Sequence, residues 1–165
     1  MGIRDQAKMG YSVPMNDHEI RIDATLDQLL KTIDEPWESL RWVLEKYPPE
    51  KMGDPSQAGT GAWHLMHLVE VFRIHAKAFM GQDEIERWPA MPTDVESAGK
   101  MVREDAHRFA AWCRANPERV GTVKHGQEQT FQEMMGVMLR HIVWHAAAVH
   151  YWCLWKGTSS NEPRP

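Results

Sequence analysis

Apolar residues recur every three or four positions, the spacing of an amphipathic helix, in four stretches of the chain. The first covers about residues 23–47 and contains Pro36, where we expect a kink or a break. The second covers about residues 61–80, with Thr60 as a plausible N-cap and Gly81 as its end. No stretch shows the two-residue alternation of a strand between hairpin turns, so we expect no sheet.

The third and fourth stretches each follow a capping-box pattern. Thr93–Glu96 precedes a helical stripe that ends at Asn116-Pro117, and Thr130–Glu133 opens the longest stretch, about residues 131–156, which Gly157 ends. Four helices with connections of moderate length predict an all-α fold, an antiparallel four-helix bundle.

The 165 residues are most simply one domain. We expect the bundle over residues 18–157, an N-terminal arm over residues 1–17 and a disordered tail over residues 158–165. The chain begins with polar residues, which is not typical of a secretory signal. Its longest apolar stretch contains two histidines and is shorter than the ~20 residues of a membrane span. These features predict a cytoplasmic protein without a membrane partner.

The composition narrows the function classes. The 19 basic and 23 acidic residues give a net charge of −4, which argues against a nucleic-acid partner. Cys113 and Cys153 form no Cys-x-x-Cys motif, so we expect small buried hydrophobes and no thiolate metal site. The 8 Trp and 11 Met fit packing roles better than a ligand cage, and the 9 His remain as candidates for chemistry.

A histidine pair lies on the predicted last helix. His141 and His145 belong to a seam with alternating spacings of four and three, made of Met134, Met138, His141, His145, Ala148 and Trp152. Imidazoles one turn apart can bind one metal ion at nitrogen distances near ~2.0–2.1 Å. The alternative is a pair of core or interface histidines that hydrogen-bond to backbone or water. The glutamate of the zinc-protease pattern His-Glu-x-x-His is absent, so that assignment fails.

A third ligand would come from the predicted helix at residues 61–80, which contains His64, His67 and His75. On a helical wheel, His64 and His75 share one line at the edge of the apolar arc. His67 lies about 60° further toward the polar side. Periodicity alone therefore favours His64. Glu70, one turn from His67, is either a solvent-facing charge or an acceptor for that histidine.

Two motifs resemble the second and fourth helices of the DinB/YfiT-like superfamily over about residues 24–157. They are Thr60-(x)6-His67-Leu68-Val69-Glu70 and Thr130-Phe131-Gln132-Glu133 followed by Leu139-Arg140-His141-(x)3-His145. The resemblance implies a four-helix bundle that holds a divalent metal, often nickel or zinc, through three histidines. Those ligands fall on His67, His141 and His145, because the His-Leu pair and its distance to the closing glycine match the family at His67. His64 is the reserve.

The resemblance also implies a function. Relatives include metal-dependent hydrolases and transferases or isomerases that use low-molecular-weight thiols, and a homodimer would fit the family. We therefore expect a metal-dependent hydrolase or thiol-dependent transferase acting on a small molecule. Many members have a polar run after the second ligand of the pair, where this chain has Ala146-Ala147-Ala148-Val149-His150, which weakens inference of the substrate. The alternative is a non-catalytic dimeric bundle with a structural or sensory histidine cluster. A third hypothesis is a heme bound by two histidines of the bundle, but the sequence contains no heme-attachment motif.

Overall fold

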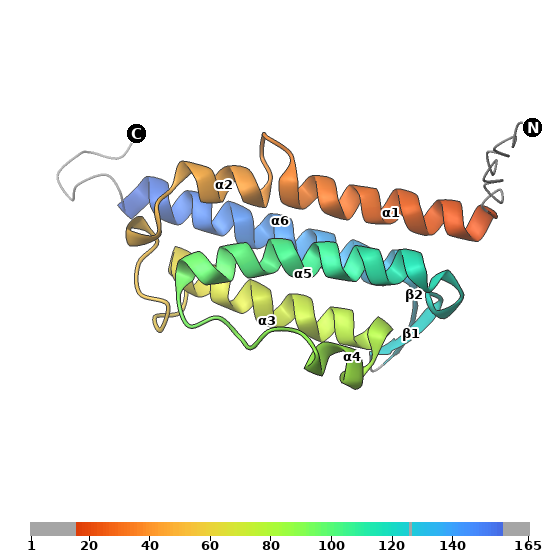
Figure 1. The fold of residues 1–165 in the computed structure, drawn as a ribbon. Helices are drawn as coiled ribbons and strands as arrows, with labels where there is room; N and C mark the ends of the chain where they lie inside the picture. Colours follow the sequence, from red (N-terminus) through yellow and green to blue (C-terminus); the bar gives the residue numbers. More distant parts are fainter. Residues whose placement is uncertain (1–15, 126, 157–165) are drawn as a thin grey trace, which may run out of the picture.

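The computed structural model describes residues 16–125 and 127–156 (Figure 1). Its helices are α1 (Asp17–Asp34), α2 (Leu40–Lys46), α3 (Gly61–Met80), α4 (Gln82–Glu86), α5 (Val95–Ala115) and α6 (Phe131–Lys156). Two 3-10 turns, Pro49–Lys51 and Pro117–Arg119, and two strands, β1 (Thr122–His125) and β2 (Gln127–Thr130), complete the described part. The tail predicted at residues 158–165, and all but the last two residues of the predicted arm at 1–17, lie outside the described residues.

The four long helices α1, α3, α5 and α6 pack side by side and form a helical bundle. In Figure 1, α1 and α6 run in one direction, while α3 and α5 run in the other. The expected antiparallel arrangement therefore holds for α1 against α5 and for α3 against α6. It does not hold for α3 against α5, because the segment 81–94, which contains α4, returns the chain to the end of the bundle where α3 begins.

The helix ends follow the predicted signals in two of the long helices. Thr60 caps α3 by accepting a hydrogen bond from the backbone N–H of Trp63 at 3.1 Å, and Gly81, at φ 89°, ends it. The capping box before α6 is present, because the backbone N–H of Thr130 donates to Glu133 at 2.8 Å and the Thr130 hydroxyl accepts in return at 3.3 Å.

Two helix starts differ from the prediction. The N-cap of α5 is Asp94 rather than Thr93, because its carboxylate accepts from the backbone N–H of Ser97 at 2.8 Å. Helix α1 begins at Asp17 rather than near residue 23, because Asn16 and Glu19 form a capping box on a first turn that has little apolar periodicity. The break expected at Pro36 is confirmed, and Ser39 caps the separate helix α2.

The expectation of no sheet is wrong. Strands β1 and β2 form a short antiparallel hairpin between α5 and α6, with Thr122 opposite Thr130 and Lys124 opposite Glu128. Strand β2 consists of polar, mostly exposed residues, so backbone pairing forms it without the apolar alternation that marks a half-buried strand in a sequence.

The core lies between the four long helices. The apolar arc predicted for α3 is buried throughout, namely Leu65, Leu68, Val69, Phe72, Ala76 and Phe79. The α6 seam is buried at Met134, Met138 and His145, but its other members, His141, Ala148 and Trp152, are half-buried. The residue after each of these is buried instead, Ile142, Val149 and Cys153, because a straight helix drifts away from a strict heptad repeat.

Ion pairs connect α5 to its neighbours. Asp34 on α1 accepts hydrogen bonds from Arg103 at 2.7 Å and His107 at 2.6 Å. Asp105, fully buried on α5, accepts from Arg73 on α3 and from Arg108 on its own helix, both at 2.6 Å. These contacts hold α5 against α1 and α3, and α3 carries two of the three histidines of the cluster described below.

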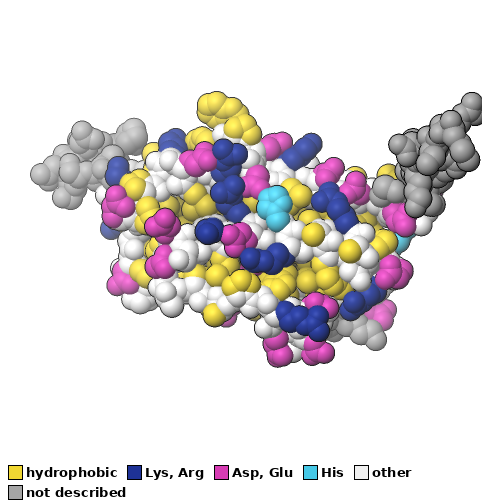
Figure 2. All heavy atoms as spheres, in the orientation of Figure 1, with side chains coloured by type: hydrophobic (Ala, Val, Ile, Leu, Met, Phe, Trp, Pro, Cys, Tyr) yellow, Lys and Arg dark blue, Asp and Glu magenta, His cyan; other side chains and the backbone are white. Residues whose placement is uncertain are grey.

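Two observations bear on the predictions of no nucleic-acid partner and no membrane partner. Figure 2 shows acidic and basic side chains intermixed on the visible face, not a field of one sign. Among the described helices, none is both long and apolar enough to cross a membrane.

Candidate functional site

Histidines of α3 and α6 meet where these two helices pack. The Nδ1 atoms of His64 and His145 lie 2.9 Å apart, so one imidazole donates a hydrogen bond to the other. The ring of His67 also contacts His145, with 5.2 Å between ring centroids. The side chains of His64, His67 and His145 therefore form one cluster, which we call the histidine cluster.

His145 is at the centre of this cluster and is 1% exposed. Its Nδ1 contacts His64, but its Nε2 is buried and has no hydrogen-bond partner among the described residues. Burial of a polar nitrogen without a partner is unfavourable by several kcal/mol at most and by about 1–3 kcal/mol in typical protein measurements. A hydrogen-bond donor, a hydrogen-bond acceptor or a metal ion at this atom would remove that cost.

The surroundings of His145 and His64 favour the neutral form of both imidazoles. Burial, followed by the nearby imidazoles of His64, His67 and His141, lowers the pKa of His145 to about 4. Burial and the neighbouring His67 also lower the pKa of His64 below its usual value of 6.5. Neutral imidazole, with a free lone pair on one nitrogen, is the form in which histidine binds a metal ion.

His141, the other member of the predicted pair, lies beside the cluster. Its ring stacks on His145 with 6.1 Å between centroids, and its Nδ1 contacts the backbone carbonyl of Val137 at 3.3 Å. Its second neighbour is His75 on α3, at 5.5 Å between centroids. The Nδ1 of His75 lies 2.7 Å from the carbonyl oxygen of Val71. The α6 pair thus contacts three histidines of α3.

The two candidate histidines of α3 both contact His145. His64 is buried, as the helical wheel predicted, whereas the side chain of His67 is 34% exposed and its Nδ1 lies 3.5 Å from the exposed carboxylate of Glu70. Over residues 16–125 and 127–156, no three or more His, Cys, Asp or Glu side chains are positioned to hold a metal ion. The structure therefore gathers the predicted residues without arranging them as a ready three-ligand site.

Two tryptophans border the histidine cluster. The indole of Trp63 stacks on His67 at 4.8 Å and 13°, and Trp144 contacts the rings of His64 and His145 edge-on at 5.7 and 4.8 Å. Trp144 is nevertheless 62% exposed, as is Trp155, so neither side chain is buried in the core. Trp144 therefore separates the cluster from solvent on one side.

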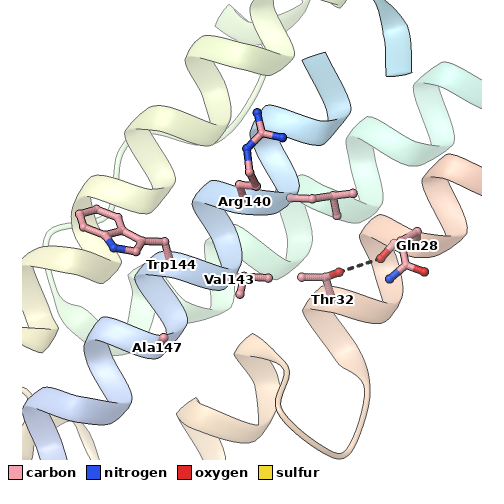
Figure 3. Close-up of a pocket in the computed structure, with 7 residues that line it drawn as sticks. Gln28, Thr32, Arg140, Val143, Trp144 and Ala147 are labelled. Atoms are coloured by element: carbon pink, nitrogen blue, oxygen red, sulfur yellow. Dashed lines mark hydrogen bonds between the residues drawn. The ribbon is translucent and has the colours of Figure 1, made fainter. Parts of the chain in front are cut away.

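Trp144 also lines two hollows on the surface of α6. The larger is an open groove of about 640 Å³ between α1 and α6 (Figure 3). Its lining residues are Gln28, Thr32, Leu139, Arg140, Val143, Trp144 and Ala147. The smaller, about 290 Å³, is lined by Val137, Arg140, His141 and Trp144. Small-molecule sites have volumes of about 300–1,000 Å³, so the larger groove suits a small ligand.

Three further histidines contact residues outside the cluster. His150 accepts or donates a hydrogen bond with the Tyr47 hydroxyl at 2.8 Å, and His107 binds Asp34. His18 contacts the carbonyl oxygen of Pro117 at 3.2 Å. None of these contacts involves a second histidine, so they are separate from the cluster.

Both cysteines are buried, as predicted. Burial raises the pKa of the Cys113 thiol to about 12 and raises that of Cys153 as well. A thiol with a raised pKa stays protonated at neutral pH and is a poor nucleophile. Neither cysteine is therefore a candidate for covalent chemistry.

Sequence reasoning missed Arg140 and Trp144 as residues of a surface hollow. A signal was present, because these residues are one turn apart on the outward side of α6, where a large aromatic side chain is out of place in a simple bundle. It also missed the contact between His75 and His141, although the wheel placed His75 on the same line as His64.

Comparisons of the chain with protein-family models, with curated proteins and with solved structures found no match. The function is therefore argued from the site itself.

Proposed function

We propose that this chain is a divalent-metal-binding protein with the architecture of the DinB/YfiT-like four-helix bundles. The supporting observation is the buried Nε2 of His145, which has no partner among the described residues, on a ring that contacts the imidazoles of His64 and His67. A metal ion bound to this nitrogen would remove the unfavourable free energy of burying it without a partner. Nitrogen donors of this type suit nickel or zinc.

The proposed ligands are His67, His141 and His145, with His64 as the alternative on α3. The likeness to the family favours His67, and the Nδ1 contact of 2.9 Å to His145 favours His64. Trp63 packs on the ring of His67, and Trp144 packs on the rings of His64 and His145. The carboxylate of Glu70, 3.5 Å from Nδ1 of His67, would orient that imidazole by accepting a hydrogen bond from its ring N–H.

The proposed activity is metal-dependent hydrolysis, or transfer to a low-molecular-weight thiol, on a small electrophilic molecule. A bound divalent ion lowers the pKa of water or of a thiol and so supplies a nucleophile at neutral pH. The chain itself contributes an open groove of about 640 Å³ beside the cluster and an aromatic wall, Trp144, between the two. A cytoplasmic location without nucleic-acid or membrane partners belongs to this proposal.

Elemental analysis of protein purified without a nickel column tests the proposal. We expect close to one nickel or zinc ion per chain, which exchanges with added metal. Loaded protein should hydrolyse model esters or amides, or transfer a thiol to a model electrophile, faster than protein stripped with a chelator. Protein that contains no metal and takes up none on titration would contradict the metal site and the enzyme together.

A second candidate is a non-catalytic dimer with a structural or sensory histidine cluster. It is favoured by the lack of a ready three-ligand group in the described part of the chain and by exposed apolar side chains on α6, among them Val143, Tyr151 and Leu154. The proposed dimer would pack through this side of α6. Under this alternative, the role of the cluster is the hydrogen bond between His64 and His145, which joins α3 to α6, and the protein binds no metal.

A further inference from the structure

Arg140 differs from most arginines of the bundle. Ion pairs involve Arg41, Arg73, Arg87, Arg103, Arg108 and Arg114. The guanidinium of Arg140 has no hydrogen-bond or ion-pair partner among the residues that the structure describes. An arginine carries five donors and stays charged at all physiological pH values, so it is free to bind an anion.

The position of Arg140 links this charge to the candidate site. Arg140 lines both hollows, and Trp144, one turn further along α6, also lines both. Figure 3 shows that neither side chain points toward Gln28 or Thr32 of α1, whereas Val143 does point toward Thr32. The smaller hollow also contains His141, one of the proposed ligands, so a molecule held by Arg140 and Trp144 would lie beside the histidine cluster.

The linings of the two hollows favour an anion over a cation. Apart from Arg140 and the titratable His141, their side chains are uncharged, and neither lining contains an aspartate or a glutamate. Leu139, Val143, Trp144 and Ala147 make the larger of these hollows largely apolar. A planar carboxylate matches the guanidinium through two parallel hydrogen bonds, and a flat apolar group matches an exposed indole.

The helix leaves room for the guanidinium next to Gly136. A Cβ atom at Gly136, one turn before Arg140, would lie 3.4 Å from the nearer terminal nitrogen of Arg140. The arginine therefore folds back along α6 over this glycine, which is the usual direction of long side chains on a helix. A larger side chain at position 136 would push the guanidinium aside and leave its charge intact.

We propose that Arg140 and Trp144 form a carboxylate-binding subsite, and that the substrate is a small carboxylate with a flat apolar or aromatic body. Arg140 binds the carboxylate, and Trp144 packs against the body and places the rest of the molecule beside His141. The identification of the ligand as a substrate rests on the proposed function. Binding of the carboxylate itself requires only the side chains of Arg140 and Trp144.

Ligand-observed fluorine NMR on the full chain tests the subsite, with 4-fluorophenylacetate as the anion and 4-fluorophenylacetamide as its neutral counterpart. We expect the parent to bind the anion in the millimolar range or tighter, and Arg140→Gln to weaken it by about tenfold or more. Arg140→Lys should be intermediate, because lysine keeps the charge but loses the planar fork. Gly136→Leu should weaken binding without a change of charge.

The control variant is Arg21→Gln, which removes an exposed arginine of α1 that lines neither hollow. It should bind the anion as the parent does, and the neutral amide should bind equally weakly to all variants. No binding by the parent, or equal binding by the parent and Arg140→Gln, would overturn the subsite. The same titrations on chelator-treated and metal-loaded protein keep the two proposals apart, because the metal content is measured separately from the Arg140-dependent binding.

Discussion

The Nδ1 atoms of His64 on α3 and His145 on α6 lie 2.9 Å apart in the interior of the bundle. Two neutral imidazoles at this distance share one hydrogen bond, so the donor ring must carry its proton on Nδ1 and the acceptor ring on Nε2. If His145 is the acceptor, its buried Nε2–H has no partner; if it is the donor, its Nε2 lone pair has none. Nε2 of His145 is therefore unsatisfied in either tautomer, and a ligand bound at that atom would satisfy it.

The contact between His64 and His145 should appear as a coupling energy in metal-free protein. His64→Ala should reduce the free energy of unfolding by about 1–3 kcal/mol, because it leaves a second nitrogen of His145 buried without a partner. The double variant with His145→Ala should lose less than the sum of the single variants. Urea unfolding measures all four proteins. Strict additivity would contradict the hydrogen bond.

Asp105 should be the most sensitive carboxylate for stability. Asp105→Asn removes the fully buried carboxylate that binds the largely buried guanidinium of Arg73, so we expect a loss of about 3–5 kcal/mol in the free energy of unfolding. The matched control is Glu104→Gln, whose half-exposed carboxylate also binds Arg108 and which should cost less than about 1 kcal/mol. Equal losses for the two variants would show that burial of Asp105 is not decisive.

Asp34 should make stability depend on pH in the acid range. Burial raises its pKa, but the hydrogen bonds from His107 and Arg103 outweigh burial, and the pKa lies below its usual 3.8. Because the folded protein holds the proton more weakly than the unfolded chain, this stabilisation is complete above pH 3.8 and is lost as pH falls through the folded pKa.

The comparison of the parent with Asp34→Asn isolates this effect. The parent should be the more stable protein at neutral pH, and the difference in the free energy of unfolding should shrink toward zero below pH 3.8. Urea unfolding across this range measures it. A difference that does not change with pH would mean that the carboxylate charge does not stabilise the α1–α5 contact.

The exposed apolar side of α6 should mediate self-association under the dimer proposal. Leu154→Arg should convert a dimer into a monomer, because a charge would be buried against the partner's apolar surface. The control Ile74→Arg replaces an equally exposed apolar side chain on α3, 44% in both cases, and should leave the dimer intact. Sedimentation velocity distinguishes the two states. A monomeric parent, or dissociation by both variants, would contradict this interface.

Much of the fold could be predicted from periodicity and caps. The bounds of α3 and α6 follow directly from Thr60, Gly81 and Thr130, because these residues satisfy the unpaired backbone groups at the helix ends. The β hairpin and the early start of α1 could not be predicted, because both depend on polar residues with backbone or capping hydrogen bonds and have no apolar pattern.

The histidine cluster was partly predictable. The wheel gave the burial of His64 and the seam gave that of His145, because burial follows helical phase. Neither pattern could predict the contact between His141 and His75, because this contact depends on how the side chains of two different helices pack. The same limit applies to Trp144, whose exposure depends on how closely α1 and α3 approach α6.

The most direct test of the account is a metal titration of chelator-treated parent and His145→Gln, with His107→Gln as the control variant outside the cluster. The parent and His107→Gln should bind close to one nickel or zinc ion per chain, and His145→Gln should bind it at least about 100-fold more weakly. His64→Ala and His67→Ala in the same series identify the ligand from α3. A parent that takes up no metal, or a His145→Gln variant that binds it as tightly as the parent, would contradict the metal site.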